Sequence, residues 1–143
     1  MDGLGSGGNL DSAMSEKSIL HEILARGEGF GHRQHVELTW RCLDDHRPDA
    51  AGRLVGDELR RLAAAHGTPD RFHATITSAW VHCVAVHRQR WPAESFDGFI
   101  DRNPDLLDPT LLEHFFSPEL IRSEAARAEA VEPDRGALPA LRS

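Results

Sequence analysis

Two histidines three residues apart, His32 and His35, lie in the stretch FGHRQHVELTW over residues 30–40. Residues three apart on a helix share one face. A third histidine, His73, opens the stretch FHATITSAW. Imidazole nitrogens ligate divalent metals and transfer protons near neutral pH. These three residues are therefore the candidates for catalytic or metal-binding chemistry.

The first stretch, arranged as a helix with about 100° per residue, places its histidines toward the interior. Val36, Thr39 and Leu43 lie within about 40° of His32, with His35 and Trp40 at the two edges of this face. The charged residues occupy the opposite arc. We therefore expect both imidazoles of this helix to point inward.

The second stretch gives a matching arrangement when it is treated as a helix that includes His73. Thr77 and Trp80 lie within about 40° of His73, whereas His82 lies on the far side and should be solvated. A buried histidine needs a partner for each ring nitrogen. Three inward histidines on two helices thus favour a shared polar pocket, although each could instead be satisfied separately and simply pack.

Two chemistries fit these histidines. In the first, His32, His35 and His73 ligate one divalent transition metal, such as Zn²⁺, that holds a water at an open position. In the second, no metal is needed, because a buried neutral imidazole is a suitable general base and a second histidine returns the proton. The sequence leaves both open.

Further polar and aromatic residues on the same faces would complete a substrate site. Thr39 and Thr77 would orient a ring or bind a substrate oxygen, and Trp40 and Trp80 would wall an apolar or planar ligand. Arg33, beside the histidine pair, would steer an anionic substrate.

The elements that must position these residues are all helices, because no segment shows a period of two. Proline and glycine residues delimit them. The expected helices cover residues 16–25, 31–45, 50–66, 71–89, 93–101, 109–116 and 118–130. The sequence therefore predicts an all-α fold, a three- or four-helix bundle with a shorter C-terminal helical region and an extended tail.

The two ends of the chain differ from this helical domain. Residues 1–15 are rich in glycine and serine and are expected to be a disordered segment or an expression remnant, so the domain spans 16–143. From about residue 131 the chain is expected to form an extended arm. Glu132 and Asp134 on this arm are either solvated or placed over the bundle, supplying a carboxylate to a histidine.

Composition excludes several classes of function. The net charge of −7 argues against binding to nucleic acid and to anionic membrane surfaces, and no apolar run approaches the roughly 20 residues of a membrane span. No secretory signal is evident at the N-terminus. With only Cys42 and Cys83, we expect free thiols in a reducing cytoplasm.

The motifs also carry a family resemblance. FxHRxH followed by Trp40, and FHxTIT over residues 72–77, resemble the motifs of a family of small, uncharacterised all-helical bacterial proteins. NPDLLD over residues 103–108 and VEPD over residues 131–134 extend the resemblance to about residues 30–139. The sequence departs from the family at Phe72, where tyrosine is expected. The resemblance implies a site at the histidines and assigns no reaction.

Three functions follow from these observations. The first is a small enzyme of lyase, isomerase, cyclase or hydrolase type that acts on a small metabolite, for instance in specialised metabolism. The second is a non-enzymatic module that binds a metal or a small ligand. The third is an interaction protein whose histidines only fix helix register in a homodimer.

Overall fold

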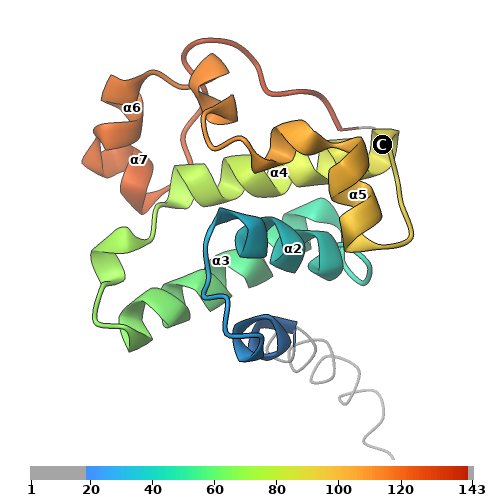
Figure 1. The fold of residues 1–143 in the computed structure, drawn as a ribbon. Coiled ribbons are helices and arrows are strands. Elements are labelled where there is room, and N and C mark those ends of the chain that lie inside the picture. Colours follow the sequence, from blue (N-terminus) through green and yellow to red (C-terminus); the bar gives the residue numbers. More distant parts are fainter. Residues whose placement is uncertain (1–18, 142–143) are drawn as a thin grey trace, which may run out of the picture.

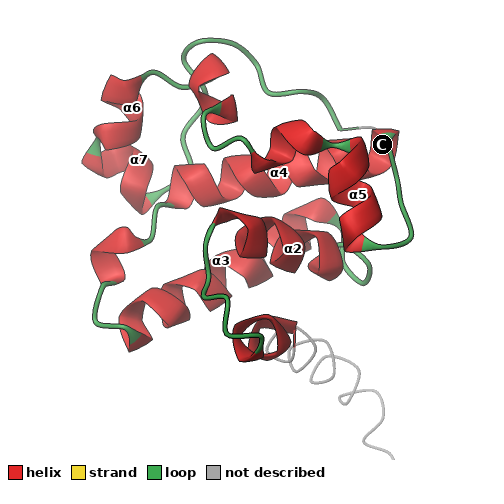
Figure 2. Cartoon of the chain, in the orientation of Figure 1, coloured by secondary structure: helices red, strands yellow, loops and turns green. Residues whose placement is uncertain are grey.

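The computed structural model describes residues 19–141, and this part of the chain contains helices and turns but no strand (Figure 2). The predicted all-α fold is therefore confirmed. A helical segment over residues 19–25 comes first. The α-helices that follow are α2 (His32–Cys42), α3 (Pro48–Ala65), α4 (Ala74–Arg90), α5 (Phe96–Arg102), α6 (Pro118–Arg122) and α7 (Glu124–Ala128). Short 3-10 helices are η1 (Pro69–Arg71), η2 (Pro104–Leu107) and η3 (Leu111–His114).

Helix α4 is the central element of the fold (Figure 1). It contacts α2 and α3 on one side and α7 and η3 on the other, and α2 and α3 also contact each other. Buried positions therefore occur all around α4, including Thr75, Trp80 and Val86. We predicted that His82 lies on a solvated face of this helix, and this prediction was wrong. His82 is half-buried, and its Nε2 donates to the Pro139 carbonyl at 2.5 Å.

Several helix boundaries follow from proline, glycine and serine. Pro48 occupies the first turn of α3, where its missing N–H costs nothing, so this helix begins two residues before the predicted start at residue 50. Gly67 adopts a positive φ of 70° and ends α3. The predicted helix over 118–130 is divided at Ser123, which is extended and whose Oγ accepts from the Ala126 amide at 3.1 Å.

The start of α4 differs from the prediction in a way that matters for the site. The chain turns through η1 and is extended at Phe72 and His73, so α4 begins at Ala74 rather than at residue 71. His73 is thus the N-cap of α4 and not a residue on its face. Its imidazole accepts a hydrogen bond from the Ile76 amide in the first turn of α4, as the side chain of an N-cap residue does.

The two ends of the domain lie on different sides of it (Figure 1). The prediction for residues 1–15 falls outside the described residues. The C-terminal arm follows α7, and its Arg135 amide donates to the Phe115 carbonyl at 2.9 Å. Asp134 accepts from the Ser117 amide and hydroxyl at 2.8 and 2.6 Å, which lowers the pKa of Asp134. This carboxylate therefore holds the arm to α6 rather than serving a histidine, and Glu132 is exposed.

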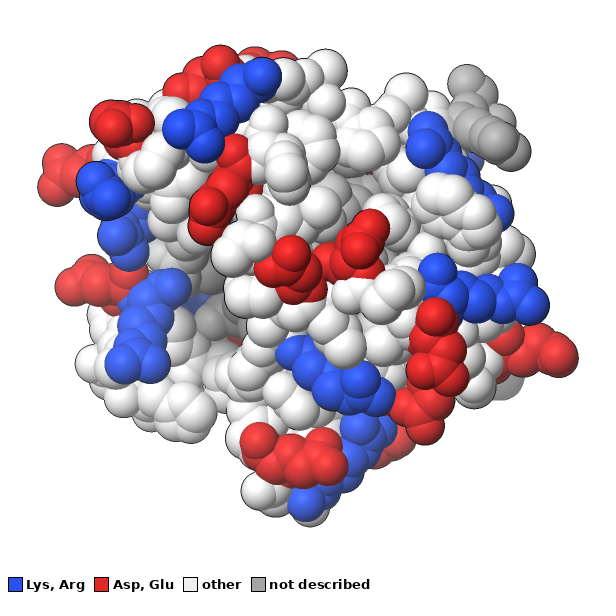
Figure 3. Space-filling view, turned by 45° about the horizontal axis from the view of Figure 1, so that its top comes forward, with Lys and Arg blue, Asp and Glu red and all other residues white. Residues whose placement is uncertain are grey.

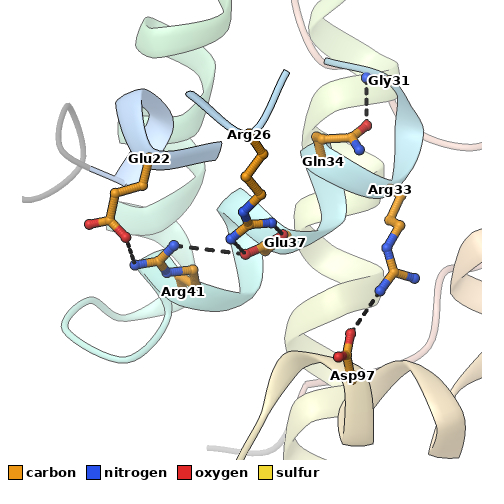
Figure 4. A network of polar contacts seen from close by, with 8 residues as sticks. All are labelled: Glu22, Arg26, Gly31, Arg33, Gln34, Glu37, Arg41 and Asp97. Atoms are coloured by element: carbon orange, nitrogen blue, oxygen red, sulfur yellow. Dashed lines mark hydrogen bonds and ion pairs between the residues drawn. The ribbon is translucent and has the colours of Figure 1, made fainter. Parts of the chain in front are cut away.

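An ion-pair network fastens the first helical segment to α2 (Figure 4). Arg26 makes two hydrogen bonds of 2.7 Å to the carboxylate of Glu37, which is buried on α2. Arg41 lies between Glu37, at 3.7 Å, and Glu22, at 3.1 Å. The buried Ile19, Leu20 and Ile23 form the apolar part of the same contact.

We expect Arg26→Ala to lower the free energy of unfolding by about 1–2 kcal/mol, because it leaves the buried Glu37 with only the longer contact to Arg41. Urea unfolding followed by circular dichroism measures this. The matched control is Arg33→Ala, which removes an exposed pair with Asp97 and should change stability by about 0.5 kcal/mol or less. Equal losses in the two variants would contradict a role for the buried carboxylate.

Candidate functional site

The three candidate histidines have different surroundings, and two of them are engaged with backbone carbonyls. His32 is half-buried, and its Nε2 donates to the Leu106 carbonyl at 2.7 Å. Its ring packs on Trp80 with 4.3 Å between the ring centroids. His32 therefore joins the start of α2 to η2 and α4.

His73 is buried, and both of its ring nitrogens have partners. Nδ1 accepts from the Ile76 amide at 3.1 Å and caps α4, while Nε2 donates to the Ile121 carbonyl at 2.7 Å. These contacts require the neutral tautomer that carries its proton on Nε2. His73 is therefore a structural junction between α4 and α6.

His35 has a different environment. Its ring is half-buried, and its Nε2 is buried without a hydrogen-bond partner among residues 19–141. Burial, and to a smaller extent the charge of nearby His32, lowers the pKa of His35 to about 4. The imidazole is therefore neutral at physiological pH, and its Nε2 is a buried polar atom without a partner in the described part of the chain.

His35 lines a pocket of about 380 Å³ between the first turn of α2, the second half of α3 and the start of α4. The lining residues are Phe30, His35, Leu59, Leu62, Ala63, His66, Thr68, Arg71, Phe72, His73, Ile76 and Thr77. Most of the walls are apolar. Among the described residues, the side chain of Arg71 has no ion pair or hydrogen bond, and it is exposed.

The pocket brings together three predicted site residues, His35, His73 and Thr77, and leaves out five others. Thr39 donates to the His35 carbonyl of its own helix at 3.0 Å. Trp40 packs between Phe96 and Phe99, with 5.8 Å between ring centroids in each pair. His32, Trp80 and Arg33 likewise take part in contacts outside this pocket. The tryptophans therefore belong to the core and do not wall the pocket.

The predicted three-histidine metal centre is not formed. No group of three or more His, Cys, Asp or Glu side chains in the described part of the chain is arranged to hold a metal ion. Two of the proposed ligands, His32 and His73, instead use ring nitrogens in bonds to Leu106 and Ile121. The prediction assumed that His73 lies on a helix face, whereas His73 is the N-cap of α4.

Several pocket residues were not among the predicted site residues, although the sequence did carry a signal for them. Leu59 and Leu62 lie three residues apart on α3, the spacing of one apolar helix face, and both line the pocket, while Leu59 also packs against the core. Phe72 immediately precedes His73, and Phe30 lies two residues before His32. Thr75 was also missed: its Oγ1 donates to the Ala126 carbonyl at 2.7 Å and accepts from the Val131 amide at 3.1 Å, tying α4 to α7 and the arm.

Three further observations concern the described residues outside the pocket. Cys42 and Cys83 are both buried and form no disulfide, as predicted, and burial raises the pKa of Cys83 to about 11. None of the helices within residues 19–141 has the length and apolar character needed to cross a membrane. Figure 3 shows acidic and basic side chains interspersed over one face rather than gathered by sign.

Comparison of the chain with protein-family models, with curated proteins and with solved structures gave no significant match. The resemblance to the small bacterial family therefore stays a prediction from the motifs alone.

Proposed function

We propose that the protein binds a small, mainly apolar ligand in the His35 pocket. The observation that carries this proposal is the neutral imidazole of His35, with a buried unpaired nitrogen, in the wall of a mostly apolar pocket. An unpaired buried polar atom costs about 1–3 kcal/mol, so a ligand that pairs with it recovers that energy. A rotation of the ring about its Cβ–Cγ bond, a soft torsion, would turn this nitrogen toward the ligand.

The pocket also indicates the shape of the ligand. Its volume lies at the lower end of the roughly 300–1,000 Å³ found for small-molecule sites. Phe30, Leu59 and Leu62 would enclose an apolar body, while the unpaired guanidinium of Arg71 would attract an anionic group. Two buried cysteines that form no disulfide support a reducing compartment such as the bacterial cytoplasm.

The fluorescent probe 8-anilinonaphthalene-1-sulfonate, which combines an apolar body with one anionic group, tests the proposal. We expect saturable 1:1 binding, and we expect Leu62→Trp, which fills the pocket, to weaken it by at least about tenfold. The matched control is Leu107→Trp, another half-buried leucine, which lies outside the pocket. Isothermal titration calorimetry gives the stoichiometry and the dissociation constants.

Binding that Leu62→Trp and Leu107→Trp weaken equally would place the probe elsewhere and overturn the proposal. His35→Leu separates the two parts of the site. It keeps the apolar walls but removes the imidazole, and we expect a loss of about five- to tenfold because one hydrogen bond is lost.

A second candidate function is acid–base catalysis on a ligand in the same pocket. The neutral imidazole of His35 could accept a proton, and the hydroxyl of Thr77 lies in the same lining. The two-histidine relay has less support, since His32 and His73 are held by backbone carbonyls. Loss of turnover in His35→Ala with unchanged helix content would favour catalysis over binding alone.

A further inference from the structure

One face of α3 carries alternating charges separated by glycines. The residues of this face, called the α3 stripe below, are Asp49, Gly52, Arg53, Gly56, Asp57 and Arg60. Their spacing of three or four places them on one side of the helix. All of them line a groove of about 700 Å³ between α3 and α4.

The charges of the α3 stripe have few partners within the molecule. All four charged residues are exposed, and none forms an ion pair with another described residue. Asp49 accepts only from the adjacent Ala50 amide, and Arg60 lies over the Phe72 ring at 4.6 Å. The two acidic and two basic side chains are therefore available to a partner.

The two glycines are not required by the fold of the single chain. Both lie inside α3 with ordinary helical φ, where glycine costs about 1 kcal/mol relative to alanine. A Cβ at Gly56 would meet nothing within 4 Å, and one at Gly52 would only reach ordinary contact with Val81, at 3.7 Å. A helix surface without side chains allows another helix to approach closely.

The order of the charges makes the α3 stripe complementary to itself. In a two-fold antiparallel pair centred between Gly52 and Gly56, Asp49 faces the partner's Arg60 and Arg53 faces the partner's Asp57. Each charge thus meets its opposite, and the glycines meet at the centre. A parallel pair in register would instead oppose like charges.

We propose that the protein forms a homodimer in which α3 packs antiparallel against α3 of a second copy. Helix α3 has 18 residues and is about 27 Å long, so the interface is at the small end of specific contacts. Dissociation constants in the micromolar range are therefore expected. Phe72 and Thr77 line both the groove and the His35 pocket, so the second copy would lie beside that pocket.

Charge reversal tests the pairing, with sedimentation velocity from about 5 to about 500 µM as the readout. Asp49→Arg with Asp57→Arg makes the stripe entirely basic, and Arg53→Glu with Arg60→Glu makes it entirely acidic. We expect each variant to be monomeric where the wild type is dimeric, and an equimolar mixture of the two to form a heterodimer. Gly56→Leu should prevent dimerisation by bulk alone.

The matched control is Asp101→Arg with Asp105→Arg, which changes net charge as much as the basic variant, at exposed positions outside the groove. It should dimerise like the wild type. A monomeric wild type would overturn the proposal and leave the groove to another occupant. Dimers retained by both reversed variants, or a mixture that stays monomeric, would overturn this pairing. Circular dichroism verifies that each variant is folded.

Discussion

His73→Ala is expected to lower the free energy of unfolding by about 2–4 kcal/mol. The substitution removes the N-cap of α4, a loss of typically about 1 kcal/mol. It also removes the donor to the Ile121 carbonyl, and a buried acceptor left without a partner costs about 1–3 kcal/mol. Urea unfolding followed by circular dichroism measures the change.

A second substitution at the same position separates the two contributions. Asparagine is a favourable N-cap but is too short to reach the Ile121 carbonyl, so His73→Asn should recover about 1 kcal/mol of the loss. The control is His66→Ala, at the exposed end of α3, which should change stability by about 0.5 kcal/mol or less. If His73→Ala were as mild as the control, His73 would not be a structural residue.

The stability of the wild type is expected to fall on acidification through the titration of His35. The pKa of this histidine is about 4 in the folded protein and 6.5 in the unfolded chain. Between these two pH values the unfolded chain binds more protons than the folded protein. The contribution of neutral His35 to the free energy of unfolding is therefore fully present above about pH 6.5 and is lost as the pH falls toward 4. The difference between the two pKa values of His35 corresponds to as much as about 3 kcal/mol in the free energy of unfolding.

His35→Leu should remove this dependence. At about pH 7 we expect the variant to match the wild type or exceed it by about 1 kcal/mol, because the unpaired nitrogen is gone. At about pH 4.5 the advantage should grow to about 3 kcal/mol. His114→Gln, at an exposed histidine, is the control and should follow the wild type at every pH. Parallel pH profiles of His35→Leu and wild type would contradict a depressed pKa at His35.

If His35→Leu makes the protein more stable and also weakens ligand binding, His35 serves binding and not stability. His35 lowers stability at the position where it is proposed to act, whereas His32 and His73 join helices through backbone carbonyls. The same residue type thus serves opposite purposes within one small domain. At neutral pH His73→Ala should therefore lower the stability, whereas His35→Leu should leave it unchanged or raise it.

Local sequence signals were enough to place the ends of α3 and the direction of the first two histidines. Pro48 and Gly67 delimit α3 through backbone rules that act within a few residues. The period of α2 turns His32 and His35 inward, because Val36, Thr39 and Leu43 on the same face are buried. Local propensity and periodicity are sufficient for predictions of this kind.

The tertiary structure alone decided what each inward histidine contacts. The carbonyl of Leu106 lies 74 residues after His32, and that of Ile121 lies 48 residues after His73, so no local pattern pairs them. The extended backbone at Phe72 and His73 moved His73 from a helix face to a helix cap. His35 was left unpaired because the elements that meet at its pocket bring apolar side chains there, and that outcome depends on how distant segments pack.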